Sequence, residues 1–139
     1  MADREVPSPD EAGQCREADM SAPDVNVWMD EVKNRPDSDA VGMMLAHRGV
    51  VRGHSRSGEP VTGMMLTVDR AKLDEAVAEA LRSEGVVAVR VWVNEGSLSV
   101  GDDIMSVLVA GDIRENVFGA LQRLVSFLKT EVLAERELR

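Results

Sequence analysis

Apolar residues follow two different periods along this chain, and each period predicts one kind of element. A spacing of three or four residues between apolar side chains is typical of one face of an α-helix. It occurs in three segments: a short one that ends at Pro36, a second from Asp69 to Glu84, and a third from Asp112 to near the end of the chain. Alternation of apolar and polar residues, typical of strands, occupies the segments between these helices. The sequence therefore predicts the order α–ββ–α–ββ–α.

The strands are predicted to pair as two hairpins. In the first, residues 41–68, two apolar runs flank the turn-rich sequence SRSGEP. In the second, VVAVRVWVN at residues 86–94 and IMSVLVAG at residues 104–111 flank a polar turn. Short connections of this kind favour antiparallel pairing. We therefore expect an α+β fold of two antiparallel β-hairpin-plus-helix units preceded by a short helix.

Capping residues set the expected starts of the helices. Ser21 and Asp24 are both plausible N-caps of the first helix. Asp112, followed three residues later by Glu115, predicts a capping box at the start of the last helix. One apolar stripe keeps helical spacing along that helix and is expected to be buried: Ile113, Val117, Leu121, Leu124, Leu128 and Val132.

Charge divides the chain into two parts. The 139 residues carry a net charge of −9, but residues 1–40 hold 11 acidic and 4 basic side chains and account for most of it. Residues 1–20 contain few large apolar side chains and are predicted to be a disordered acidic tail. Residues 21–139 are predicted to form one near-neutral domain. The excess of acid disfavours nucleic acid and acidic membrane surfaces as partners.

Targeting signals are not visible in the sequence. No apolar run approaches the roughly 20 residues of a membrane span, and the first residues lack the apolar region of a secretory signal. The single cysteine, Cys15, cannot form an intrachain disulfide, which fits a reducing compartment. The sequence therefore predicts a cytoplasmic protein.

Several groups that could carry chemistry have a simpler structural explanation. Asp102, Asp103 and Asp112 could suggest a metal site, but the first two are adjacent at the start of a strand and point apart, and Asp112 is the expected cap. His47 and His54 lie on the first hairpin without a nucleophile elbow, and a surface or strand-end position is more common for them than a catalytic one. We expect no metal and no cofactor.

Basic side chains of the domain are stronger candidates for a site. Lys129 is predicted beside the apolar stripe of the last helix, where partial burial would suit it to proton transfer or nucleophilic attack. Arg114 is predicted at the start of that helix, where backbone N–H groups attract anions, and Arg52 ends the first strand. A guanidinium in such a place can clamp phosphate or carboxylate, although each arginine alone is more typical of a solvated surface.

Three runs of sequence together resemble a known family. G-V-V-R at residues 49–52 precedes a polar turn and a strand, and E-G-S-L-S-V-G-D-D-I leads into V-L-V-A-G-D-I-R-E-N-V-F. F-L-K lies near the end of the last helix. In this order and spacing, over residues 25–139, the chain resembles the large, catalytic subunit of molybdopterin synthase.

The resemblance implies a fold, an activity and partners. It implies an α/β-hammerhead fold and a homodimer that binds the C-terminal Gly-Gly tail of a small ubiquitin-like sulfur carrier at each end. It implies sulfur transfer from the thiocarboxylate of this tail to cyclic pyranopterin monophosphate, which forms molybdopterin in molybdenum cofactor biosynthesis. Lys129 then corresponds to the catalytic lysine, and Arg52 and Arg114 to groups that hold phosphate or the carrier tail. Arg136 keeps a positive charge where the family has a second lysine.

Some basic positions of the family are replaced in this chain. Val93 and Asn94 stand where the family usually has one His-Arg pair, and Ile113 replaces the histidine of a second pair before Arg114. Residues 133–136 replace Pro-x-Trp-Lys. Two alternatives to the sulfurtransferase stay open: a catalytically impaired relative that still binds the carrier, and an unrelated dimeric ligand-binding module.

Helix geometry predicts that two protomers share each site. Arg114 and Lys129 are 15 residues apart, which separates them by roughly 22 Å along one helix. Lys129 and Arg136 would be roughly 10 Å apart on the same helix. We therefore expect each site to combine Lys129, Arg136 and Arg52 of one chain with Arg114 of the other.

Overall fold

The structure, a computed structural model, describes residues 22–139. The predicted tail, with Cys15, and the candidate cap Ser21 lie outside these residues. The helical elements are α2 (Val25–Lys33), η1 (Ser38–Ala40), α3 (Arg70–Leu81), α4 (Arg114–Phe127) and η2 (Leu128–Val132). The strands are β1 (Met43–Val50), β2 (Gly63–Val68), β3 (Val86–Val93), β4 (Gly96–Ser99), β5 (Asp103–Gly111) and β6 (Leu133–Leu138).

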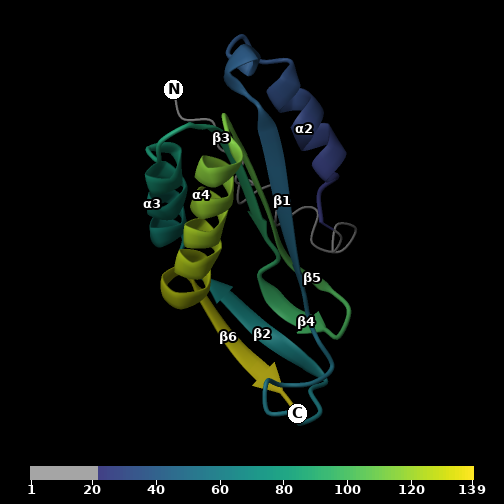
Figure 1. The fold of residues 1–139 in the computed structure, drawn as a ribbon. Helices are drawn as coiled ribbons and strands as arrows, with labels where there is room; N and C mark the ends of the chain where they lie inside the picture. The colour runs from purple at the N-terminus through teal and green to yellow at the C-terminus, as the bar shows by residue number, and fades with distance from the viewer. Residues whose placement is uncertain (1–21) are drawn as a thin grey trace.

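The strands form two antiparallel sheets of three strands each. β5 lies between β1 and β3 in the first sheet, and β2 lies between β4 and β6 in the second. Helices α3 and α4 lie side by side on one face of the first sheet, and α2 lies on the other side of it (Figure 1). The second sheet extends below α4, so that the chain passes from α4 through η2 directly into β6 (Figure 1). The predicted α+β class is confirmed.

The first predicted hairpin is wrong in its pairing, although both of its strands are present. β1 pairs with β5, with Met43 opposite Gly111, whereas β2 pairs with β4 and β6. The turn sequence SRSGEP lies in the loop that joins the two sheets, where His54 and Pro60 form an isolated bridge. The second hairpin is confirmed, because β3 and β5 are paired, and β4 lies within its predicted turn.

The last helix ends earlier than the sequence predicts. α4 stops at Phe127, and the π turn η2 leads into β6. Leu128 and Val132 of η2 are still buried, as their helical spacing predicts. The expectation that Lys129 and Arg136 share a helix is wrong, because Arg136 lies in β6 and is paired with the central strand β2.

The capping box predicted for α4 is also wrong. Ile113 occupies the N-cap position and makes no side-chain capping hydrogen bond. The carboxylate of Asp112, one residue earlier, accepts hydrogen bonds from the side-chain amide of Asn116 (2.9 Å) and from the N–H of Ile113 (2.6 Å). Both hydrogen bonds lower the pKa of Asp112, that of Asn116 most strongly. The Asp112 side chain is thus kept in its charged form near the start of α4, where the helix dipole favours a negative charge.

The other two helices have acidic N-caps. At the start of α2, the carboxylate of Asp24 accepts a hydrogen bond from the N–H of Asn26 at 2.9 Å. At the start of α3, Asp69 accepts one from the N–H of Lys72 at 3.1 Å. Of the two caps that the sequence allows for the first helix, the structure selects Asp24.

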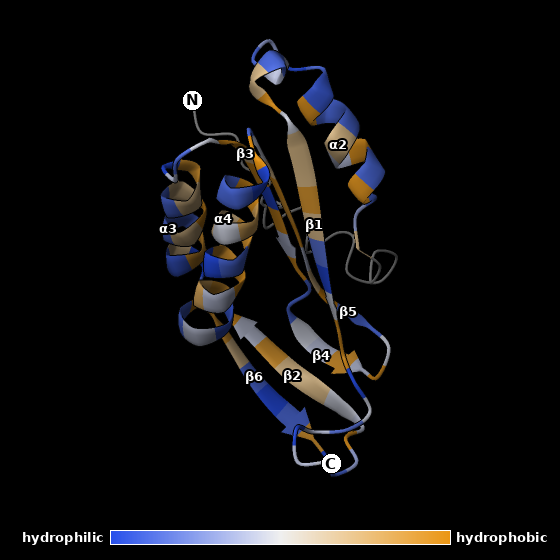
Figure 2. Ribbon diagram, viewed as in Figure 1, coloured by the Kyte–Doolittle hydropathy of each residue, from blue (hydrophilic) through white to orange (hydrophobic). Residues whose placement is uncertain are grey.

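Two apolar clusters pack on opposite faces of the first sheet. The larger one joins α3, α4 and η2 to the inner faces of both sheets, and the smaller one places Trp28 and Val32 of α2 against Ala88 and Trp92 of β3. The strands of the first sheet are mostly hydrophobic, whereas β6 is mainly hydrophilic after its first residues (Figure 2). Within residues 22–139, no helix is long and apolar enough to cross a membrane.

Candidate functional site

Lys129 projects from the π turn between α4 and β6. Its neighbour Leu128 is fully buried and Val132 is nearly so, which fixes the backbone of the turn on the core. The Lys129 side chain is 49% exposed, and its Nζ lies 3.6 Å from a carboxylate oxygen of Glu135 in β6. The turn therefore presents a half-exposed ammonium group on a rigid support, next to one carboxylate.

His47 of β1 lies near this ammonium group. Alternate residues of a strand share one face, and on this face Met43 and Leu45 pack against the larger cluster, which includes α4. His47 is the next residue on the same face and is half-buried. Its pKa is lowered below 6.5, first by burial and then by the positive charge of Lys129. The charge of Lys129 thus reaches the imidazole, so the two side chains lie in the same region of the molecule.

Arg52 directly follows β1 and is exposed. The residue before it, Val51, is buried, and its N–H and carbonyl oxygen bond the carbonyl oxygen of Asp102 and the N–H of Gly101, each at 2.9 Å. Arg52 comes five residues after His47, or about 16 Å along the chain at roughly 3.3 Å per residue of extended backbone. Arg52 is therefore an exposed side chain on a backbone that the neighbouring hydrogen bonds fix.

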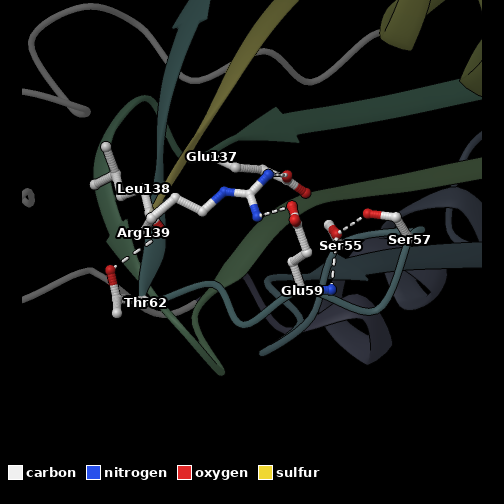
Figure 3. Close-up of polar contacts among 7 residues, drawn as sticks. All are labelled: Ser55, Ser57, Glu59, Thr62, Glu137, Leu138 and Arg139. Carbon is white, nitrogen blue, oxygen red and sulfur yellow. Dashed lines mark hydrogen bonds and ion pairs between the residues drawn. The ribbon is translucent and has the colours of Figure 1, made fainter.

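The loop after Arg52 is fastened to β6. The N–H and hydroxyl groups of Thr62 donate hydrogen bonds to the carbonyl oxygen of Leu138 at 2.8 and 3.2 Å, and Arg139 forms an ion pair with Glu59 (Figure 3). Within the loop, the Ser55 hydroxyl accepts a hydrogen bond from the N–H of Glu59 (Figure 3). These contacts fix the loop that carries Arg52 to the second sheet.

Arg136 points away from Lys129 within the protomer. In β6, Glu135 lies opposite Leu66, which is fully buried, so Glu135 is on the core side of the sheet. Arg136 lies opposite Met65 and projects from the other face, because neighbouring strand residues alternate. The structure therefore does not bring Arg136 to Lys129 in the way that a continuous helix would.

Arg114 is the first residue of α4 and is exposed. α4 separates it from Lys129 by roughly 22 Å at about 1.5 Å per residue, as the sequence predicts. One protomer thus cannot place both side chains on one small ligand.

Val93 and Asn94, which stand where the family has basic residues, support the structure of the sheet. Val93 is buried, and the side-chain amide of Asn94 donates a hydrogen bond to the carbonyl oxygen of Asp103 at 2.9 Å. The carboxylate of Asp102 accepts one from the N–H of Ser99 at 2.8 Å. In the described part of the chain, no group of three or more histidine, cysteine or acidic side chains could hold a metal ion.

Sequence reasoning underestimated His47. It favoured a surface or strand-end position for His47, whereas the structure half-buries the imidazole and brings the charge of Lys129 near enough to lower its pKa. The alternation of Met43, Leu45 and His47 carried a signal, because it put the imidazole on the buried face of the strand. The sequence could not show which element would cover that face, because this depends on the path of α4 across the sheet.

Comparison with known proteins identifies the family of the chain. The sequence model of the MoaE protein family matches residues 21–131. No curated protein sequence matches the chain significantly.

Solved structures share the fold. One is the molybdopterin biosynthesis MoaE protein from Burkholderia ambifaria MC40-6, with 21% identity, a TM-score of 0.68, and coverage of 99% of this chain and 89% of that one. Another is the complex of subunits 1 and 2 of molybdopterin-converting factor from Helicobacter pylori 26695, with 14% identity, a TM-score of 0.63, and coverage of 96% and 83%. A third, molybdopterin synthase from Staphylococcus aureus, has 15% identity, a TM-score of 0.62, and coverage of 99% and 90%.

The family match spans most of the chain, and the shared fold agrees with it. The chain therefore belongs to the MoaE protein family, the large subunit of molybdopterin synthase, and its role lies in molybdenum cofactor biosynthesis.

Proposed function

We propose that this protein transfers sulfur from the thiocarboxylated tail of a small ubiquitin-like carrier to cyclic pyranopterin monophosphate, with Lys129 at the reacting atoms. The observation that carries the proposal is the presentation of Lys129 as a half-exposed ammonium on a turn anchored by Leu128. Lys129 is also the residue to which the sequence resemblance assigns the role of the catalytic lysine. Membership of the family excludes the third alternative, an unrelated ligand-binding module.

Lys129 would neutralise charge and move protons during the transfer. A thiocarboxylate is an anion, and it can replace Glu135 as the partner of the Lys129 ammonium. Each transfer replaces a carbon–oxygen bond of the pterin with a carbon–sulfur bond, and the displaced oxygen group leaves with a proton. Water then cleaves the bond between the sulfur and the carrier's acyl carbon, which leaves the carrier with a carboxylate. A positioned ammonium can stabilise the developing negative charge and donate a proton to the leaving group.

The arginines are proposed to hold the ends of the bound substrates. Arg52 lies about 16 Å along the chain from His47, a separation that an extended peptide tail of about five residues spans. Arg114 lies at the far end of α4, so we propose that Arg114 of the partner subunit completes each site of a homodimer. Arg136, on the outer face of an edge strand, is proposed to bind the carrier protein.

The H. pylori neighbour is a complex of two different subunits of a molybdopterin-converting factor. This supports the proposal that the present chain also assembles with a small subunit, its sulfur carrier. The cytoplasmic location that the sequence predicts stays a prediction.

A catalytically impaired relative that only binds the carrier is the second candidate. It is favoured by the replacement of basic residues at Val93 and Asn94, both of which are buried in roles that support the sheet. Ile113, at the third such position, is exposed and apolar. These residues cannot supply positive charge to a phosphorylated substrate.

One assay separates the two candidates. The protein is mixed with thiocarboxylated carrier and cyclic pyranopterin monophosphate, and the dithiolene product is measured by mass spectrometry. We expect product from the wild type and a loss of about 10²–10⁴-fold in rate for Lys129→Ala. Carrier binding without any product would instead establish the impaired relative.

A matched control is available in the chain. Lys72 is exposed to nearly the same extent as Lys129, at 47%, and pairs with Glu131 at 3.8 Å. Lys72→Ala removes an equivalent surface ion pair, and we expect it to leave the rate unchanged. Equal losses in the two variants would contradict the role of Lys129.

A further inference from the structure

We propose that His47 is part of the Lys129 site and takes up a proton there when a divalent anion, such as a phosphate monoester, binds. The inference rests on the proposed function for the location of the site at Lys129. It adds a second cationic group to that site and makes ligand binding dependent on pH.

The fold places His47 opposite the end of α4. α4 and β1 begin at the same height along the sheet. Gly42, one residue before β1, packs against the backbone carbonyl of Asp112, two residues before α4. α4 then runs about 20 Å, and β1 reaches His47 after about 13 Å and Gly49 after about 20 Å. The turn that follows α4, with Lys129, therefore lies level with the second half of β1, on the face of the sheet that α4 covers (Figure 1).

The neighbour of the imidazole on this face of the strand is a glycine. Gly49 is the next residue after His47 that projects to the same side, and a Cβ atom there would lie 3.9 Å from Nε2 of His47. Because Gly49 has no side chain, this position does not cover Nε2, although the same Cβ would lie 3.5 Å from Cβ of Ile104 and 3.7 Å from Cγ of Met105 in β5. Beyond Gly49, Val51 is buried and Arg52 is exposed, so alternation directs the Arg52 side chain to the other face of the strand.

Few charged groups face the imidazole in the described residues. Lys129 approaches it from η2, with Glu135 of β6 bound to the same ammonium. On the adjacent strand β5, the residue opposite His47 is Val107, which is apolar and buried. Arg48, the next residue of β1, projects from the opposite face and lies 4.0 Å from Asp103.

These surroundings keep the empty site neutral at His47. Burial and the charge of Lys129 both disfavour the imidazolium, and together they lower the pKa of His47 below 6.5. A divalent anion reverses this balance, since its charge outweighs that of the nearby ammonium and favours protonation. The proton comes from solvent, and no covalent bond changes.

Linkage gives the size of the effect. If the bound anion raises the pKa of His47 by one unit, the protein binds the anion ten times more tightly at a pH below both pKa values of His47, with and without the anion, than at a pH above both. Affinity for a dianion should therefore rise as the pH falls through the region below 6.5. A monovalent carboxylate should produce a smaller rise.

The test is an NMR titration of the full chain, which contains two histidines. The probes are sulfate, which stays divalent over pH 5–8, and N-acetylglycylglycine, which stays a monovalent carboxylate. His54 is exposed and serves as an internal control. We expect Lys129→Met to raise the titration midpoint of His47 and to leave that of His54 in place. Sulfate should raise the His47 midpoint in the wild type, and more than the peptide does.

A second arm measures affinity directly. The affinity for sulfate is determined at pH 5.5 and pH 8 for the wild type, His47→Phe and His54→Phe. We expect the rise at low pH to be lost in His47→Phe and kept in His54→Phe. An equal rise in all three proteins, or a His47 midpoint that Lys129→Met or sulfate leaves unchanged, would overturn the inference.

The outcome is independent of the sulfur-transfer assay. If the protein shows proton-linked sulfate binding at His47 but makes no dithiolene, this inference stands and the proposed activity is wrong. If the protein makes dithiolene but shows no coupling between His47 and Lys129, the proposed activity stands and this inference is wrong.

Discussion

The position of Lys129 depends on one buried side chain, that of Leu128, and replacing it with alanine tests this dependence. Leu128 is the first residue of the π turn and is fully buried in the larger cluster. Its side chain holds the turn against the core at the point where the chain leaves α4 for β6. Removal of this side chain should destabilise the fold and loosen the turn together.

The expected magnitude follows from burial. Leu128→Ala removes the equivalent of three methylene groups from the core, about 2.4 kcal/mol at roughly 0.8 kcal/mol each. The cavity left behind adds to this cost, so the loss should be about 3–4 kcal/mol, within the range of about 2–5 kcal/mol for such substitutions. For a domain of this size, an unfolding entropy of about 0.25 kcal/mol/K converts 3 kcal/mol into a fall in Tm of about 12 °C.

Urea denaturation followed by circular dichroism measures the loss, with Thr130→Ala as the control. Thr130 lies in the same turn but is exposed, and its hydroxyl group donates a hydrogen bond to the carbonyl oxygen of Ser126 at 3.0 Å. We expect this control to change the free energy of unfolding by less than about 0.5 kcal/mol. If Leu128→Ala lost no more than about 1 kcal/mol, or no more than the control, the turn would not be held by core packing.

Three other predictions test the fold around the site. Gly63→Ala should destabilise by about 2 kcal/mol or more in thermal unfolding, because its Cβ would collide with the carbonyl oxygen of Leu98; Gly53→Ala, whose Cβ would contact only Val100 at 3.7 Å, should be tolerated. Asp69→Ala should lose about 1 kcal/mol in urea titrations through loss of the α3 cap, and Asp69→Asn, which can still cap, should lose less. Because the pKa of His47 is lower in the folded protein, the free energy of unfolding should fall as the pH drops from 6.5 toward the folded-state pKa; this fall should be absent in His47→Phe, and an unchanged slope would contradict it.

Local patterns predicted the elements of this fold better than their partners. The periods of apolar residues located the three helices and most of the strands, because side-chain periodicity is a property of each segment alone. The turn sequence SRSGEP correctly marked a loop. It could not show that the flanking strands pair with β5 and with β4 and β6, since pairing is set by long-range contacts.

The end of α4 shows the same limit near the site. Leu128 and Val132 keep helical spacing, so the sequence predicts a helix through Lys129 and beyond. The structure instead makes a π turn and a strand, because the last residues complete the second sheet beside β2. This pairing, and not a local signal, turns Arg136 away from Lys129 and brings Glu135 to it.

The sequence by itself determined the class of the fold, the family resemblance and Lys129 as the leading candidate, because these depend on residue type and order. Tertiary structure decided which faces are covered. β3 has the alternation of a half-buried strand, yet it is buried on both faces because α2 packs over Ala88 and Trp92. In the same way, only the path of α4 across the sheet brought the charge of Lys129 near enough to His47 to lower its pKa.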